Sequence, residues 1–178
     1  ATLGKRMRAV QELGRVLNET ADGDFGVQRV CSGFGAPSLL VALMLECGEE
    51  REATRNDIMH CLAALTSFTT AAELSDTRLW SLLMRMLYQR DEESLMYAVL
   101  SLENMTRHDE CLKMMRASKR LNALLPTLCT SSHETIAASA SALAATLARA
   151  AAEERFEALQ AELATPAAAQ ADAGTARG

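Results

Sequence analysis

The sequence of 178 residues is poor in aromatic residues and in proline. Aromatic side chains make up 4% of the chain, and there are only three prolines. Aromatic and β-branched residues favour strands, whereas this chain is rich in leucine, alanine, methionine and arginine, which favour helices. Because 49% of the residues are hydrophobic, the chain is too apolar to be disordered throughout. The composition therefore predicts an all-α protein and excludes fibrous and proline-rich classes.

Long apolar runs and an excess of basic charge are also missing. No apolar run reaches the roughly 18 residues of a membrane-spanning helix, so we expect no membrane partner. A formal net charge of −5 disfavours a chain-wide affinity for nucleic acid. Basic residues nevertheless gather in two clusters, which are Lys5, Arg6, Arg8 and Arg15 and then Lys113, Arg116, Lys119 and Arg120. Each cluster is either a solvated helix face or a contact surface for an acidic protein partner.

Cysteine is present without the spacing of a disulfide framework. The five cysteines are Cys31, Cys47, Cys61, Cys111 and Cys129, an odd number of residues that lie largely in apolar helical patterns. We interpret them as buried, reduced thiols of an intracellular protein, located in the cytoplasm or the cytoskeleton.

Hydrophobic periodicity predicts a series of helices with a recurring order. An amphipathic helix over 3–19 is followed by three rounds, each of a short helix, an apolar helix and a longer helix. The predicted ranges are 25–32, 37–47 and 51–68, then 70–75, 77–88 and 93–106, then 108–116, 119–129 and a long helix from Glu134. A loop is expected over 20–26, and Gly48 is expected to end the second helix of the first round.

An overlay of the rounds reveals an internal repeat. The segment Leu62-Ala63-Ala64-Leu65-Thr66 aligns with Leu102-Glu103-Asn104-Met105-Thr106 at a spacing of 40, and the latter aligns with 144–148 at a spacing of 42. Such a unit cannot bury its apolar faces alone, so stacked units have to share one core. The period therefore indicates an α-solenoid.

Two segments make the chain resemble the armadillo repeat family. Gly35-Ala36-Pro37-Ser38-Leu39-Leu40 is similar to the opening of that family's second helix, and residues 98–106 (AVLSLENMT) are similar to the end of its third. The resemblance implies a right-handed α–α superhelix of about three repeats with a leading helix. The HEAT repeat has a similar period and is the structural alternative, but the short helix before each pair favours armadillo.

The predicted domain organisation follows from the repeat. Residues 1–150 form the armadillo-like domain, with a leading helix over 3–19 and repeats over about 25–68, 70–107 and 108–150. Residues 151–164 extend the last helix with an apolar seam of Phe156, Leu159 and Leu163, which either caps the stack or binds a partner helix. Residues 165–178 are predicted to be a flexible, alanine-rich tail.

The sequence contains no recognisable catalytic motif. It has no phosphate-binding glycine loop and no Gly-x-Ser-x-Gly elbow. His108, Cys111, Cys129 and His133 have residue types and local spacings that zinc could use, but the two cysteines occupy core-type positions and the histidines flank loops. We therefore expect no metal, no cofactor and no enzymatic activity.

The armadillo family binds extended peptides along a concave groove of third helices. At the matching asparagine position of the importin-type receptors this chain has Ala64, Asn104 and Thr146, and it lacks their tryptophan, which disfavours a nuclear-signal receptor. The groove residues implied by the resemblance are Arg8, Gln11, Arg15, Asp57, His60, Tyr97 and Asn104. Each of them could equally belong to an ordinary exposed helix face.

The function that this reading favours is a non-catalytic scaffold or adaptor. Its expected partners are proteins, presented as an extended peptide or a helix of acidic character, and the chain would be a subunit of a larger intracellular or cytoskeletal assembly. The alternative is a regulatory or chaperone-like factor that clamps an enzyme or an ATPase.

Overall fold

The computed structural model describes residues 2–19, 26–47, 52–74 and 76–164, and these residues form α-helices without any strand. Ten helices are present in this part of the chain: α1 (Leu3–Glu19), α2 (Gly26–Gly33), α3 (Ala36–Cys47), α4 (Glu52–Thr66), α5 (Ala71–Leu74), α6 (Thr77–Met86), α7 (Glu92–Met105), α8 (Asp109–Ala117), α9 (Lys119–Cys129) and α10 (Glu134–Ala164). The prediction of an all-helical fold is confirmed.

The observed helix bounds differ from the predicted ones by two residues at most. Most of the predicted loop at 20–26 lies outside the described residues. Gly48 and the predicted tail at 165–178 lie entirely outside them. The break between α2 and α3 occurs at Phe34-Gly35, where Gly35 has a φ of 72°. This left-handed conformation is easily adopted only by glycine. It turns the chain, so that α3 runs in a different direction from α2.

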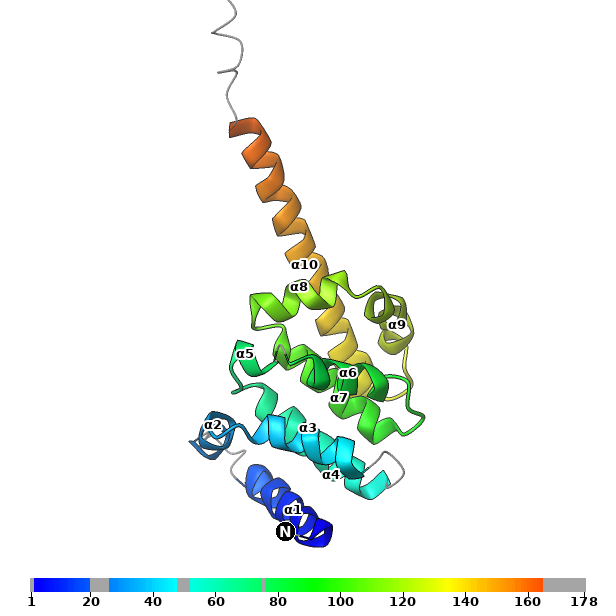
Figure 1. Ribbon diagram of the computed structural model, residues 1–178. Helices are drawn as coiled ribbons and strands as arrows, with labels where there is room; N and C mark the ends of the chain where they lie inside the picture. Colours follow the sequence, from blue (N-terminus) through cyan, green and yellow to red (C-terminus); the bar gives the residue numbers. More distant parts are fainter. Residues whose placement is uncertain (1, 20–25, 48–51, 75, 165–178) are drawn as a thin grey trace, which may run out of the picture.

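Four of the helices pack against each other in sequence order. α1 packs on α4, α4 on α7, and α7 on α10, while α3 and α6 contact each other and lie against α4 and α7 respectively. α9 lies against α10 in the last round. Figure 1 shows this succession as a stack that begins at α1 and ends at α8, α9 and α10. Helices far apart in sequence thus share one continuous layer.

The core runs through the whole stack rather than filling one centre. Among the largest fully buried side chains are Ile58 and Leu62 in α4, Leu83 in α6 and Leu102 in α7. Leucine and methionine provide most of this packing, and the single tryptophan, Trp80, is only partly buried against it. The core is therefore well packed although aromatic residues are scarce, because branched and flexible aliphatic side chains fill the space between the stacked helices.

A buried polar network joins the start of α7 to α4. The guanidinium of Arg55 donates to Ser94 Oγ at 2.8 Å and to Asp91 Oδ2 at 3.1 Å, and Asn56 donates to Glu93 Oε2 at 2.9 Å. Asp91 also caps α7 by accepting from the backbone N–H of Ser94. Burial raises the pKa of Asp91, but these hydrogen bonds outweigh it and hold the pKa below its usual value. The network fixes the register of α7 on α4.

Helix α10 is the longest element and leaves the stack. Its first half packs on α7 and α9 through Ile136, Ala140, Leu143 and Leu147, and its second half projects beyond the other helices in Figure 1. By length and composition alone Glu134–Leu163 could cross a membrane. The buried face of its first half, however, is what a core helix of a helical stack requires.

Candidate partner-binding surfaces

The residues predicted to line a third-helix groove lie on α1, α4 and α7. Gln11 Nε2 donates to Asp57 Oδ2 at 3.1 Å, which joins α1 to α4. The rings of His60 and Tyr97 lie 5.2 Å apart between centroids, which joins α4 to α7. The structure therefore brings Gln11, Asp57, His60 and Tyr97 into one row across three helices.

The two aromatic groups of this row are partly buried. Burial lowers the pKa of His60, and the carboxylates of Asp57 and Glu93 oppose this shift without cancelling it. Burial also raises the pKa of Tyr97, and the Glu93 carboxylate adds to that rise. Both side chains are therefore neutral at pH 7, so the middle of the row is a weakly polar surface.

The remaining predicted groove residues lie apart from this row or are engaged within the protein. Arg8 is exposed on α1. Arg15 forms ion pairs with Glu12 and Glu19 of its own helix, which raise its pKa. The Asn104 amide donates from Nδ2 to the carbonyl of Ala63 at 3.0 Å and to Thr66 Oγ1 at 3.3 Å. These bonds hold the end of α4 against α7.

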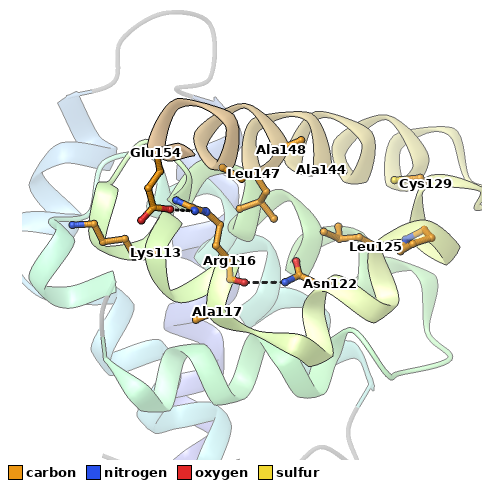
Figure 2. Close-up of a pocket in the computed structure, with 12 residues that line it drawn as sticks. Lys113, Arg116, Ala117, Asn122, Leu125, Cys129, Ala144, Leu147, Ala148 and Glu154 are labelled. Atoms are coloured by element: carbon orange, nitrogen blue, oxygen red, sulfur yellow. Dashed lines mark hydrogen bonds and ion pairs between the residues drawn. The ribbon is translucent and has the colours of Figure 1, made fainter. Parts of the chain in front are cut away.

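A wide groove lies apart from this row, between α8, α9 and α10. It has a volume of about 730 Å³, and Figure 2 shows how its walls meet. Its lining is mostly apolar, with four polar side chains at Lys113, Arg116, Asn122 and Glu154. We name it the α8–α10 groove; its apolar lining is Ala117, Leu125, Pro126, Cys129, Ala144, Leu147, Ala148 and Ala151.

Helical spacing explains why these residues share one groove. On α10 the lining residues are 144, 147, 148, 151 and 154, and on α9 they are 122, 125, 126 and 129. Residues three and four apart lie on one side of a helix, so each helix presents a single ridge to the groove. The ridge on α10 consists mostly of alanine, whose small side chains leave a channel between α9 and α10.

One end of the α8–α10 groove carries positive charge. Lys113 and Arg116 come from α8, and Arg116 forms an ion pair with Glu154 across the groove, drawn in Figure 2. Glu154 is 67% exposed, and its pKa is lowered mainly by its bond to Arg116. The carbonyl of Arg116 accepts from Asn122 Nδ2 at 2.9 Å, which fixes the end of α8 against α9. Sequence reasoning found the basic cluster but not the channel beside it.

A smaller apolar groove lies at the other end of the stack, between α1 and α3. Its volume is about 390 Å³, and Leu13, Leu39 and Leu43 are among its lining residues. Arg6 and Glu46 form an ion pair across this groove. Because its charges are balanced, it shows no preference for an acidic or a basic partner.

The residues weighed as zinc ligands do not form a metal site. Within the described ranges, no group of three or more histidine, cysteine, aspartate or glutamate side chains is arranged to hold a metal ion. Cys61 and Cys111 are buried, as predicted, whereas Cys31 and Cys129 are half-buried. Burial raises the pKa of Cys61 to about 12, so this thiol is not a nucleophile at neutral pH.

Comparison with known proteins found no matching family model, no matching curated protein and no matching solved structure. The surfaces described above therefore have to be interpreted from their own chemistry.

Proposed function

We propose that this protein is a non-catalytic scaffold or adaptor of the armadillo type, and that it works as a subunit of a larger assembly by binding a helix of a partner protein. The observation that carries the proposal is the α8–α10 groove, an apolar channel with cations at one end. Grooves of this kind accept amphipathic helices, whose side chains at i, i+3, i+4 and i+7 fill the channel.

The proposed occupant is an amphipathic helix with acidic residues. Its apolar face covers the alanine ridge of α10, where Ala148 is exposed and Ala144 and Ala151 are half-buried, and this removes exposed apolar surface from water. Its carboxylates lie over Lys113 and Arg116. Arg116 retains capacity for a second carboxylate because Glu154 engages only one edge of its guanidinium, through Nη2.

The third-helix row of His60 and Tyr97 is a weaker candidate for the principal site. Gln11 donates to Asp57, and Asn104 donates to the carbonyl of Ala63 in α4. A partner would have to compete with these internal bonds, and it would gain little apolar burial in return. The α8–α10 groove offers both unfilled apolar surface and net positive charge.

A selection from displayed helical peptides tests this proposal. We expect the wild-type protein to enrich peptides with apolar residues at i, i+3 or i+4 and i+7 and with aspartate or glutamate beside them. Lys113→Glu should weaken the enriched peptides roughly tenfold, because an attraction becomes a repulsion at the rim. Lys5→Glu makes the same change of net charge at the other end of the stack and should leave the affinity unchanged.

Two outcomes would contradict the proposal. One is enrichment of basic or non-helical peptides, and the other is an equal loss of affinity for the Lys113 and Lys5 variants. The second outcome would mean that only overall charge, and not the groove, attracts the peptides.

A further inference from the structure

Helix α10 carries a second apolar face that its own chain does not cover. Eight positions at alternating spacings of four and three follow one side of the helix, and all eight are exposed. Seven are apolar and one is an arginine: Ala138, Ala142, Ala145, Arg149, Ala152, Phe156, Leu159 and Leu163. We name this face the α10 seam. With 3.6 residues per turn it lies opposite the buried face of Ile136, Ala140, Leu143 and Leu147.

The α10 seam has small side chains in one half and large side chains in the other. Its first part, beside the helical stack, consists mainly of alanine. Its second part, on the projecting half of the helix, consists of Phe156, Leu159 and Leu163, which are 60%, 58% and 86% exposed. Large exposed apolar groups on a projecting helix are unfavourable in water unless a partner covers them.

A second copy of the same helix in antiparallel orientation fits this division. Phe156 of one copy then lies against Ala145 of the other, Leu159 against Ala142, and Leu163 against Ala138. Large side chains meet small ones in every such layer, and the two-fold axis repeats each layer at the other end. A parallel arrangement would place large against large in one half and alanine against alanine in the other, and these two halves require different distances between the helix axes.

The charges of the seam agree with the antiparallel register. Arg149 lies against Ala152 of the second copy, next to that copy's Glu153. The two-fold axis creates the same pair again, so both cations on the seam are matched by carboxylates. Three to four heptads of such spacing are the length at which paired helices become stable.

We propose that two copies of this protein associate through the α10 seam as an antiparallel, two-fold symmetric dimer. The occupant is a second copy rather than a lipid bilayer because six charged residues lie between Arg149 and Glu162. The dimer leaves the α8–α10 groove open, because neighbours on a helix point about 100° apart. Ala151 therefore lines the groove while Ala152 belongs to the seam.

Sedimentation velocity of the full chain tests the association. We expect a concentration-dependent dimer, and Leu159→Lys should raise its dissociation constant roughly 100-fold or more, because symmetry introduces the lysine into two layers. Leu45→Lys is the matched control. It places the same change on α3, where the leucine is 48% exposed, and should leave the dimer unchanged.

Cysteine cross-linking tests the register. Under mild oxidation a mixture of Ala145→Cys and Phe156→Cys chains should form a mixed disulfide, with the parent chain as the control for native thiols. Neither variant should cross-link to itself, because positions 156 of the two copies are separated by 11 residues of helix, about 16 Å.

Three results would overturn this proposal. The first is a wild-type chain that sediments as a monomer up to about 100 μM, where weak specific pairs already associate. The second is self-linked Phe156→Cys, which would indicate a parallel pair. The third is a chain that floats with vesicles of neutral phospholipid while Leu159→Lys does not, which would assign the seam to a membrane. None of these results depends on whether the groove binds acidic helices.

Discussion

Replacing Asn104 by alanine should destabilise the fold, because this side chain joins two helices of the stack. Its Nδ2 atom donates to the carbonyl of Ala63 at 3.0 Å and to Thr66 Oγ1 at 3.3 Å. A hydrogen bond contributes about 1 kcal/mol net, so two such bonds contribute about 2 kcal/mol. Alanine recovers about 0.5 kcal/mol through its higher helix propensity. The expected loss is therefore about 1–2 kcal/mol of the free energy of unfolding.

Urea denaturation followed by circular dichroism at 222 nm measures this loss. A change of about 1–2 kcal/mol also lowers the melting temperature by roughly 2–8 °C in a chain of this size. Asn18→Ala is the matched control, since Asn18 is exposed on α1, and it should leave the stability equal or slightly higher. If Asn104→Ala unfolds at the wild-type urea concentration but loses a bound partner, the residue serves binding and the structural reasoning is refuted.

Three further predictions concern the contacts between α1, α4 and α7. Asp91→Ala should lower the free energy of unfolding by about 3 kcal/mol or more, because it removes a helix cap and the carboxylate that pairs with the buried guanidinium of Arg55. Urea denaturation measures this change, and a loss below about 1 kcal/mol would show that the network contributes little. Acidification should reduce stability progressively below about pH 6.5, because the pKa of His60 is lowered in the folded state and the unfolded chain then binds more protons. Thermal melts of wild type and His60→Gln between pH 7 and pH 5 check this. An equal dependence of melting temperature on pH in the two proteins would contradict it. Gly14→Ala should stabilise the protein by about 0.5–1 kcal/mol through helix propensity, because a Cβ there would lie 3.4 Å from His60 Nδ1, within ordinary contact. Gly14→Leu should instead cost about 1–3 kcal/mol by forcing α1 away from α4, and equal melting temperatures for the two variants would contradict the close approach.

The sequence contained most of the information on the helices. Apolar periodicity and breakers such as Gly35 locate helix ends locally, so each helix could be predicted from the residues within it. The overlay of 62–66 on 102–106 also indicated which helices are equivalent. That equivalence matches the observed packing of α4 on α7, because repeated apolar positions have to face each other to share a core.

The candidate sites were harder to predict because they depend on contacts between helices. The third-helix reading placed Gln11, Asp57, His60 and Tyr97 on one face, and the structure brings them together. It did not reveal that the amide of Asn104 bonds to the end of α4, since that requires the distance between two helices. It also missed the α8–α10 groove, because a channel arises from the small alanines of α10 beside α9 and leaves no motif in either segment.

Hydrogen exchange with a selected peptide tests the central proposal most directly. The peptide is an acidic, amphipathic helix enriched by the wild-type protein, and its binding should slow amide exchange in α8 and α9 and in the part of α10 around Leu147. The proposal predicts no change in α1 or in the part of α4 around His60. Protection confined to α1, α4 and α7 would contradict it and would place the partner on the third-helix row.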